Sequence, residues 1–141
     1  IKIMVITLDN NSLRIMSFFK DKTGVTPSNI IINKTSYIFT VSKKDIQKAI
    51  GKNAQNIKFL QQKFKKNIII FELGDDIETT ISNFIFPIKL NSILKKGSTL
   101  SVLLSNPEDR VKLIRSPAKN TRNLKDVINH YYYNIRNIKL L

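Results

Sequence analysis

The chain has 141 residues, of which 42% are hydrophobic and 24% are charged, so it can build the core of one domain or of two very small ones. Its 24 Lys and Arg outnumber its 10 Asp and Glu, and a net charge of +14 in so small a chain indicates a polyanionic partner, with nucleic acid first and a membrane surface second. Cysteine is absent and His130 is the one histidine, which excludes disulfides, thiolate chemistry and histidine-based metal clusters, so we expect no cofactor and no metal.

The N-terminal residues 1–8 are largely apolar, but this run is too short for a secretory signal or a membrane span. Elsewhere, no stretch has the length and apolar character to cross a bilayer. We therefore expect a cytoplasmic protein without a membrane partner. The abundance of Ile, Lys and Asn also fits AT-rich codon usage, which is an alternative origin for part of the lysine excess.

The first half of the chain predicts a helix, two strands, two further helices and a third strand. A cluster of N-cap residues at 9–12 precedes a helical apolar face, and Gly24 ends that helix. Two β-prone runs joined by a turn follow, and then come a short helix, a break that contains glycine, a longer helix and an apolar strand. The ranges of these later elements are 30–32, 37–41, 43–50, 55–66 and 67–73.

The second half repeats this order of elements. It predicts a helix that ends before Pro87, strands joined by a turn at 95–98, a short helix, a loop at 115–118, a longer helix and a last strand. The two strands span residues 88–94 and 100–104, the short and the longer helix span 107–114 and 119–132, and the last strand spans 135–141. At an offset of 64 residues, Ala54 aligns with Ala118, and Asp45, Ile50 and Leu60 meet identical residues at 109, 114 and 124. An internal duplication accounts for this repeat and predicts two modules, residues 1–74 and residues 75–141.

The most informative segment is the loop Gly51-Lys52-Asn53-Ala54 between two predicted helices. A helix, a tight basic loop that contains glycine and a second helix form the signature of the KH module, which binds single-stranded RNA. Gly51 has no side chain to block an RNA backbone, and the helix after the loop presents free N–H groups and the positive end of its dipole to phosphate. We expect Gly51→Asp to lower RNA affinity at unchanged thermal stability.

Two groups of residues are therefore predicted to bind RNA. Those of the first module surround the loop: Lys44, Ile50, Gly51, Lys52, Asn53, Ala54, Gln55, Asn56 and Lys58. Those of the second module surround the corresponding loop: Arg115, Ser116, Lys119, Asn120 and Arg122. For Asn56 and Asn120, capping of a helix is an equal alternative to RNA contact.

Beyond the loop, the chain resembles the archaeal NusA-like transcription factors, which consist of two KH modules of the type II arrangement. The resemblance implies an α+β fold of two tandem type II KH modules, each of α-β-β-α-α-β order, packed into one compact unit. It also implies RNA binding in the control of transcription termination or elongation, with single-stranded nascent RNA and RNA polymerase as partners and no small-molecule substrate. It covers nearly the whole chain and rests on residues 8–14, 23–24, 37–41, 49–52, 56–58, 75–76, 107–110, 114, 119–120 and 132–135.

The two loops depart from the family pattern Gly-x-x-Gly to different degrees. Ala54 replaces the second glycine of the first loop, whereas Arg115-Ser116-Pro117-Ala118 contains neither glycine. Pro117 removes a backbone donor and stiffens the turn, and Arg115 adds bulk where close contact is needed. The second module is therefore predicted to bind RNA more weakly, through Lys119 and Arg122, or to serve as a packing partner of the first.

Two other functions remain as alternatives. The chain could be a degenerate KH subunit that is held on RNA polymerase or the ribosome by protein contacts. It could instead be an RNA-modifying or nucleolytic enzyme. The absence of Cys, of a His cluster and of a well-spaced carboxylate pair argues against the enzyme, so we expect no catalytic activity.

Overall fold

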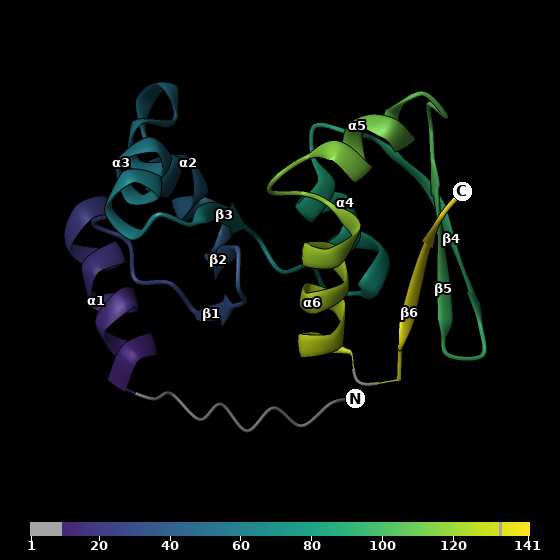
Figure 1. The fold of residues 1–141 in the computed structure, drawn as a ribbon, viewed down its shortest axis with the longest axis horizontal. Coiled ribbons are helices and arrows are strands. Elements are labelled where there is room, and N and C mark those ends of the chain that lie inside the picture. Colours follow the sequence, from purple (N-terminus) through teal and green to yellow (C-terminus); the bar gives the residue numbers. More distant parts are fainter. Residues whose placement is uncertain (1–9, 133) are drawn as a thin grey trace. The chain divides into compact units, whose positions relative to one another are not determined.

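The computed structural model describes residues 10–132 and 134–141 (Figure 1). Over these residues it contains helices and two small three-stranded sheets, so the α+β class predicted from the sequence is confirmed. The chain divides between Leu73 and Gly74 into two compact units, here called the N-terminal unit (residues 10–73) and the C-terminal unit (residues 74–141). Leu8, Asp9 and Tyr133, on which the family resemblance partly rests, lie outside the described residues.

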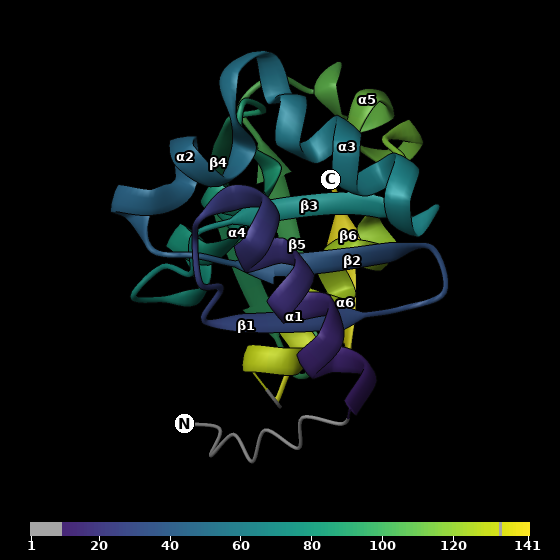
Figure 2. The same cartoon turned by 90° about the vertical axis from the view of Figure 1, so that its left-hand side faces the viewer.

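The N-terminal unit packs three helices on one face of a sheet. The sheet has the order β1-β2-β3, in which β1 and β2 are antiparallel and β2 and β3 are parallel. Helix α1 lies across this sheet (Figure 2). The bounds are α1 Asn10–Thr23, β1 Asn29–Ile32, β2 Ser36–Thr40, α2 Ile46–Ile50, α3 Gln55–Phe64 and β3 Asn67–Phe71, with single 3-10 turns at Lys43–Asp45 and Lys52–Ala54.

The core of this unit is built from apolar side chains of its helices and strands. Phe19 of α1 and Phe39 of β2 are fully buried, and their rings stack with centroids 4.2 Å apart. Ala49 of α2 and Leu60 of α3 are also fully buried in the same cluster. All three helices are therefore fixed against the sheet by fully buried side chains, which holds the α2–α3 connection in place.

The C-terminal unit has the same order of helices and strands. Its sheet runs β4-β5-β6, again with one antiparallel and one parallel pair. Leu113, Leu124 and Ile128 of its helices are fully buried, as are Leu100 and Val102 of β5. The bounds are α4 Ile77–Ile85, β4 Leu90–Lys96, β5 Thr99–Leu104, α5 Asp109–Arg115, α6 Thr121–Tyr131 and β6 Asn137–Leu140.

Several boundaries differ from those predicted, each for a local reason. The predicted turn at 95–98 is too long, because β4 continues to Lys96 and Gly97 turns the chain with a φ of 63°. Helix α3 ends at Phe64, before the predicted residue 66, because Lys65 has a left-handed φ of 57°. Arg115 belongs to α5 and not to the following loop. Helix α6 begins at Thr121, because Asn120 caps it.

Candidate nucleic-acid interface

The loop at 51–54 makes an unusual turn between α2 and α3. Three of its four residues have positive φ: Gly51 at 79°, Asn53 at 54° and Ala54 at 58°. Such φ values favour glycine, and an alanine in the left-handed region costs roughly 1–2 kcal/mol. The family pattern of glycine at both ends of the loop therefore corresponds to two positions that the backbone holds at positive φ.

Gly51 is required here for space as well as for conformation. A Cβ at this position would lie 2.9 Å from the Cγ of Asn56, closer than real Cβ contacts come. With a φ of 79° and a ψ of 165°, Gly51 also adopts a backbone conformation in which any residue with a side chain would be strained. The expectation that Gly51→Asp leaves thermal stability unchanged is therefore wrong.

The loop lies at the surface of the N-terminal unit. Lys52, Asn53 and Gln55 are exposed, and Gly51 and Ala54 are partly exposed. Ile50 is half-buried beside them. An extended polyanion can therefore approach the backbone of the loop directly, and the side chain of Lys52 is free to move above it.

The first turn of α3 starts immediately after the loop. Its N-cap is Ala54, which has no side-chain oxygen, and no side chain of the described residues caps the helix. The N–H of Gln55 donates to the carbonyl of Lys52. Because the remaining N–H groups of a first helical turn lack helical partners and the helix dipole is positive there, this end attracts anions.

The buried side chain of Asn56 links the two helices that flank the loop. Its side-chain Nδ2 donates to the backbone carbonyl of Lys48 in α2 over 3.2 Å, and the residue is only 8% exposed. The N-cap of α3 is Ala54 and not Asn56, while RNA contact by Asn56 stays a prediction. We assign it to fixing α2 and α3 on either side of the loop.

The N-terminal unit carries most of the excess positive charge. Its twelve Lys and Arg face three Asp and Glu, and Asp45 is the one acidic residue between Asp21 and Glu72. The Asp45 carboxylate accepts a hydrogen bond from Ser42 Oγ over 2.9 Å. Lys44 and Lys58 are exposed near the loop in the chain, so they add to its positive potential.

A family model described as the KH domain matches residues 14–100, from within α1 to the start of β5. The chain belongs to the KH domain family. The matched region contains the whole loop at 51–54 and both helices that flank it, and this loop is called the KH loop below.

Curated relatives carry the name probable transcription termination protein NusA. The protein of Thermoplasma acidophilum is 26% identical over 138 residues, which are 96% of this chain and 95% of the relative. That of Methanococcus vannielii is 29% identical over 141 residues, 98% of this chain and 81% of the relative. The resemblance to archaeal NusA-like proteins is thus confirmed. The crystal structure of APE1850 has the same fold, with a TM-score of 0.78 and 24% identity over 95% of this chain and all of that one.

The loop of the C-terminal unit that corresponds to the KH loop is built differently. Ser116 Oγ accepts from the N–H of Lys119 over 2.9 Å, and Asn123 Nδ2 donates to the carbonyl of Ala118 over 2.7 Å. Asn120 Oδ1 accepts from the N–H of Asn123 over 3.0 Å and so caps α6. The described residues between α5 and α6 include none with positive φ. Capping is therefore the role that the geometry gives to Asn120, and the side chains of Ser116 and Asn120 are engaged in hydrogen bonds within the unit.

The cations around this second loop are only partly available. The Nζ of Lys119 donates to the backbone carbonyl of Phe86, and burial lowers the pKa of Lys119 below its ordinary value. Arg115 and Arg122 are exposed. Of the five residues predicted to bind RNA here, two arginines thus offer free charge, while Ser116, Lys119 and Asn120 are engaged within the unit.

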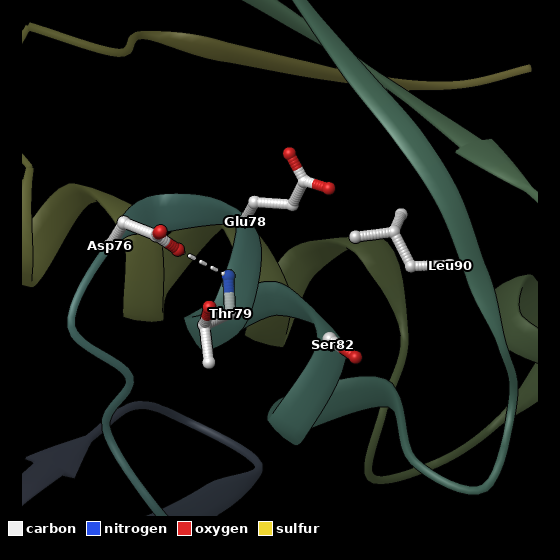
Figure 3. A pocket seen from close by; sticks show the side chains of 5 residues that line it. All are labelled: Asp76, Glu78, Thr79, Ser82 and Leu90. Carbon is white, nitrogen blue, oxygen red and sulfur yellow. Dashed lines mark hydrogen bonds between the residues drawn. The ribbon is translucent and has the colours of Figure 1, made fainter.

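An acidic pocket at the start of α4 has the opposite character. It has a volume of about 380 Å³ and is lined by Asp76, Glu78, Thr79, Ser82 and Leu90 (Figure 3). Asp76 Oδ1 accepts from the N–H of Thr79 over 2.7 Å, and the hydrogen bonds from this N–H and then from the Thr79 side chain hold the pKa of Asp76 below its ordinary value. The two carboxylates make this pocket unfavourable for phosphate, and that of Asp76 caps α4.

Neither a metal centre nor a membrane span is found in the described part of the chain. No group of three or more His, Cys, Asp or Glu side chains there is arranged to hold a metal ion. None of the helices within residues 10–132 and 134–141 combines the length and apolar character needed to span a bilayer.

Proposed function

We propose that the chain is an RNA-binding transcription factor that acts in termination or elongation by binding single-stranded nascent RNA. The observation that carries this proposal is the KH loop, which turns through three positive φ values at the surface and leads directly into an uncapped helix. The names of the archaeal relatives support a role in transcription termination.

In this proposal, RNA phosphate lies against Gly51 and is bound by N–H groups at the start of α3. Lys52 adds charge above the same point, and Lys44 and Lys58 extend the positive surface. Ile50 and the exposed Asn53 and Gln55 contact the bases or sugars beside it. A KH loop clamps about four nucleotides in this way, and the observed affinity falls with added salt because bound cations are released from the RNA.

We further propose that the two units are tandem KH modules of type II, with residues 1–74 in the first and 75–141 in the second. Their common order of helices and strands supports this, as does the sheet with one antiparallel and one parallel pair in each. In the second module, Arg115 and Arg122 supply weaker, sequence-independent contacts. No catalytic step is assigned to either module.

A protein-binding role for the C-terminal unit is the second candidate. It is favoured by the loop between α5 and α6, whose hydrogen bonds with Ser116, Asn120 and Asn123 leave little for RNA. RNA polymerase is the partner to test. Retention of purified polymerase by the chain after nuclease treatment supports a protein contact, whereas loss of the polymerase indicates that RNA bridged the two.

Paired substitutions at the two loops test the main proposal. Lys52→Glu changes an exposed residue of the KH loop, and Arg115→Glu makes the same charge change beside the second loop. We expect Lys52→Glu to weaken binding of a single-stranded RNA roughly tenfold, which is about 1.4 kcal/mol, and Arg115→Glu to weaken it much less. Equal losses for both variants at equal thermal stability would contradict the proposed role of the KH loop.

A further inference from the structure

A second basic site lies at the other end of α3 from the KH loop. It is a pocket of about 530 Å³ lined by Lys34, Thr35, Gln61, Lys65, Lys66 and Asn67, here called the lysine pocket. Lys34 and Thr35 come from the turn between β1 and β2, and Lys65 and Lys66 from the connection between α3 and β3. Gln61 belongs to α3, and Asn67 is the first residue of β3. Every lining side chain is a cation or can donate a hydrogen bond, which is the chemistry that binds a phosphate group.

The frame of the lysine pocket is fixed by hydrogen bonds. Asn33 Oδ1 accepts from the N–H of Thr35 over 3.0 Å and from that of Ser36 over 2.8 Å, which sets the turn that carries Lys34. The N–H of Asn67 donates to the carbonyl of Thr35 over 2.9 Å. These bonds join the two segments, although they are some thirty residues apart in the sequence.

The lysines are gathered by the same frame. Lys66 Nζ donates to the carbonyl of Lys34 over 2.5 Å, which directs its ammonium towards the turn between β1 and β2. Lys65 is exposed and sits at a left-handed φ of 57°, where the chain leaves α3. No carboxylate belongs to the residues that line the pocket, so its three positive charges are not neutralised locally.

Exposed polar residues connect the KH loop to the lysine pocket along α3. Gln55, Lys58 and Gln62 follow one another in α3 at intervals of three or four residues and are all exposed, and the exposed Lys65 comes directly after the end of the helix. At such intervals, side chains lie on one face of a helix. Since α3 has ten residues and a helix rises 1.5 Å per residue, the two sites are about 15 Å apart.

We propose that the lysine pocket binds phosphate of the same RNA strand that the KH loop holds, so that the RNA footprint continues along α3. This inference rests on the proposed function of the KH loop and adds a second contact site to it. The contact is independent of sequence, because lysine ammonium groups recognise phosphate as point charges. RNA too short to reach beyond the KH loop lacks this contact.

The test variant is Lys34→Gln with Lys65→Gly. The Lys34 side chain is exposed, and glycine is the residue best suited to the positive φ at position 65, so the fold is retained or stabilised while two charges are lost. Lys34→Arg with Lys65→Arg keeps the charge. Lys95→Gln with Lys96→Gln removes two exposed charges from the C-terminal unit instead.

Binding is measured for a single-stranded RNA of about four nucleotides, the length that one KH loop clamps, and for a strand about three times as long. We expect the test variant to bind the short RNA like the unaltered chain and the long RNA roughly tenfold more weakly. For the test variant and the long RNA, the slope of log affinity against log salt concentration becomes shallower by about 1.4, because each of the two lost phosphate contacts contributes about 0.7. Both control variants keep the affinity for the long RNA.

The other outcomes overturn the inference in distinguishable ways. If the test variant binds the long RNA normally, the lysine pocket is no RNA site, although the KH loop keeps its role. Binding of inorganic tripolyphosphate is measured as well. If the test variant binds both RNAs normally but no longer binds tripolyphosphate, the pocket takes a free anion and not the strand. If Lys95→Gln with Lys96→Gln weakens binding of the long RNA as much as the test variant does, the loss reflects the total charge of the chain and not the lysine pocket. If the unaltered chain binds neither RNA, the proposed function and this inference both fail.

Discussion

The side-chain Nδ2 of Asn56 in α3 donates to the backbone carbonyl of Lys48 in α2, 3.2 Å away. This bond closes the KH loop from inside, because it joins the last turn of the helix before the loop to the first turn of the helix after it. The loop can therefore hold positive φ values at Asn53 and Ala54 without a glycine at either position. Its shape is set before RNA arrives, which reduces the entropy lost on binding.

Asn56→Ala tests this support. The variant leaves the carbonyl of Lys48 without its side-chain donor, and we expect a loss of about 1–3 kcal/mol in the free energy of unfolding. RNA affinity falls as well, because the loop is less well ordered. Urea denaturation gives the first quantity and RNA titration the second. Gln55→Ala changes an exposed neighbour and serves as the control for stability, and equal stabilities of the two variants would contradict the role of Asn56.

Ala54→Gly is expected to stabilise the chain by about 0.5–1 kcal/mol. Glycine relieves the strain of a left-handed alanine, and the greater freedom of the unfolded chain offsets part of that gain. The matched control is Ala118→Gly, which changes the aligned residue of the second loop, where φ is not positive. There we expect a small loss of stability. Thermal melts of both variants decide the matter, and a gain at 118 with none at 54 would refute the account of the KH loop.

Asn120→Ala separates capping from RNA contact in the C-terminal unit. The variant loses the cap of α6, so we expect the free energy of unfolding to fall by about 1 kcal/mol. RNA affinity stays unchanged, because this side chain is engaged with Asn123. Asn120→Asp retains a capping oxygen and the original stability. Calorimetry together with RNA titration measures both effects, and weaker RNA binding by Asn120→Ala at full stability would support direct contact instead.

Lys119 gives the stability of the chain a defined pH dependence. Burial depresses its folded pKa below the value of 10.5 that it has in the unfolded chain, so between the two values the unfolded state binds more protons. The cost of burying the charge is thus present below the folded pKa and is relieved as the pH rises towards 10.5. Lys119→Met removes this group. We expect the free energy of unfolding of Lys119→Met, relative to that of the unaltered chain, to decline over that rise in pH. Urea denaturation at several pH values measures both free energies. A difference between them that stays constant with pH would contradict the burial of the ammonium.

Sequence patterns predict the elements of this fold well because its helices and strands are amphipathic or apolar in the usual periods. Phe19 and Leu60 lie on the apolar faces of the predicted helices, and both are fully buried. Phe39 belongs to a β-prone run in which consecutive residues are buried, so alternation does not single it out. The glycine pattern and the positive charge likewise indicate the KH loop. A sequence does not reveal that Ala54 adopts a left-handed φ, since alanine rarely does so.

Tertiary contacts decide the parts of the site that the sequence leaves open. Asn56 and Lys119 carry polar groups typical of RNA contacts, but each is engaged with a backbone carbonyl of its own unit. The lysine pocket depends on the parallel register of β2 and β3, which sets Ser36 opposite Asn67 and so brings the residues before each strand together. No local pattern specifies such a register across thirty residues.

Photo-crosslinking of the full chain to a single-stranded RNA, followed by mapping of the attached peptides, tests the central claim most directly. The account predicts crosslinks concentrated between residues 50 and 58, with fewer at Arg115 and Arg122. Crosslinks confined to residues 115–122, or absent from the first loop while RNA binds tightly, would contradict it.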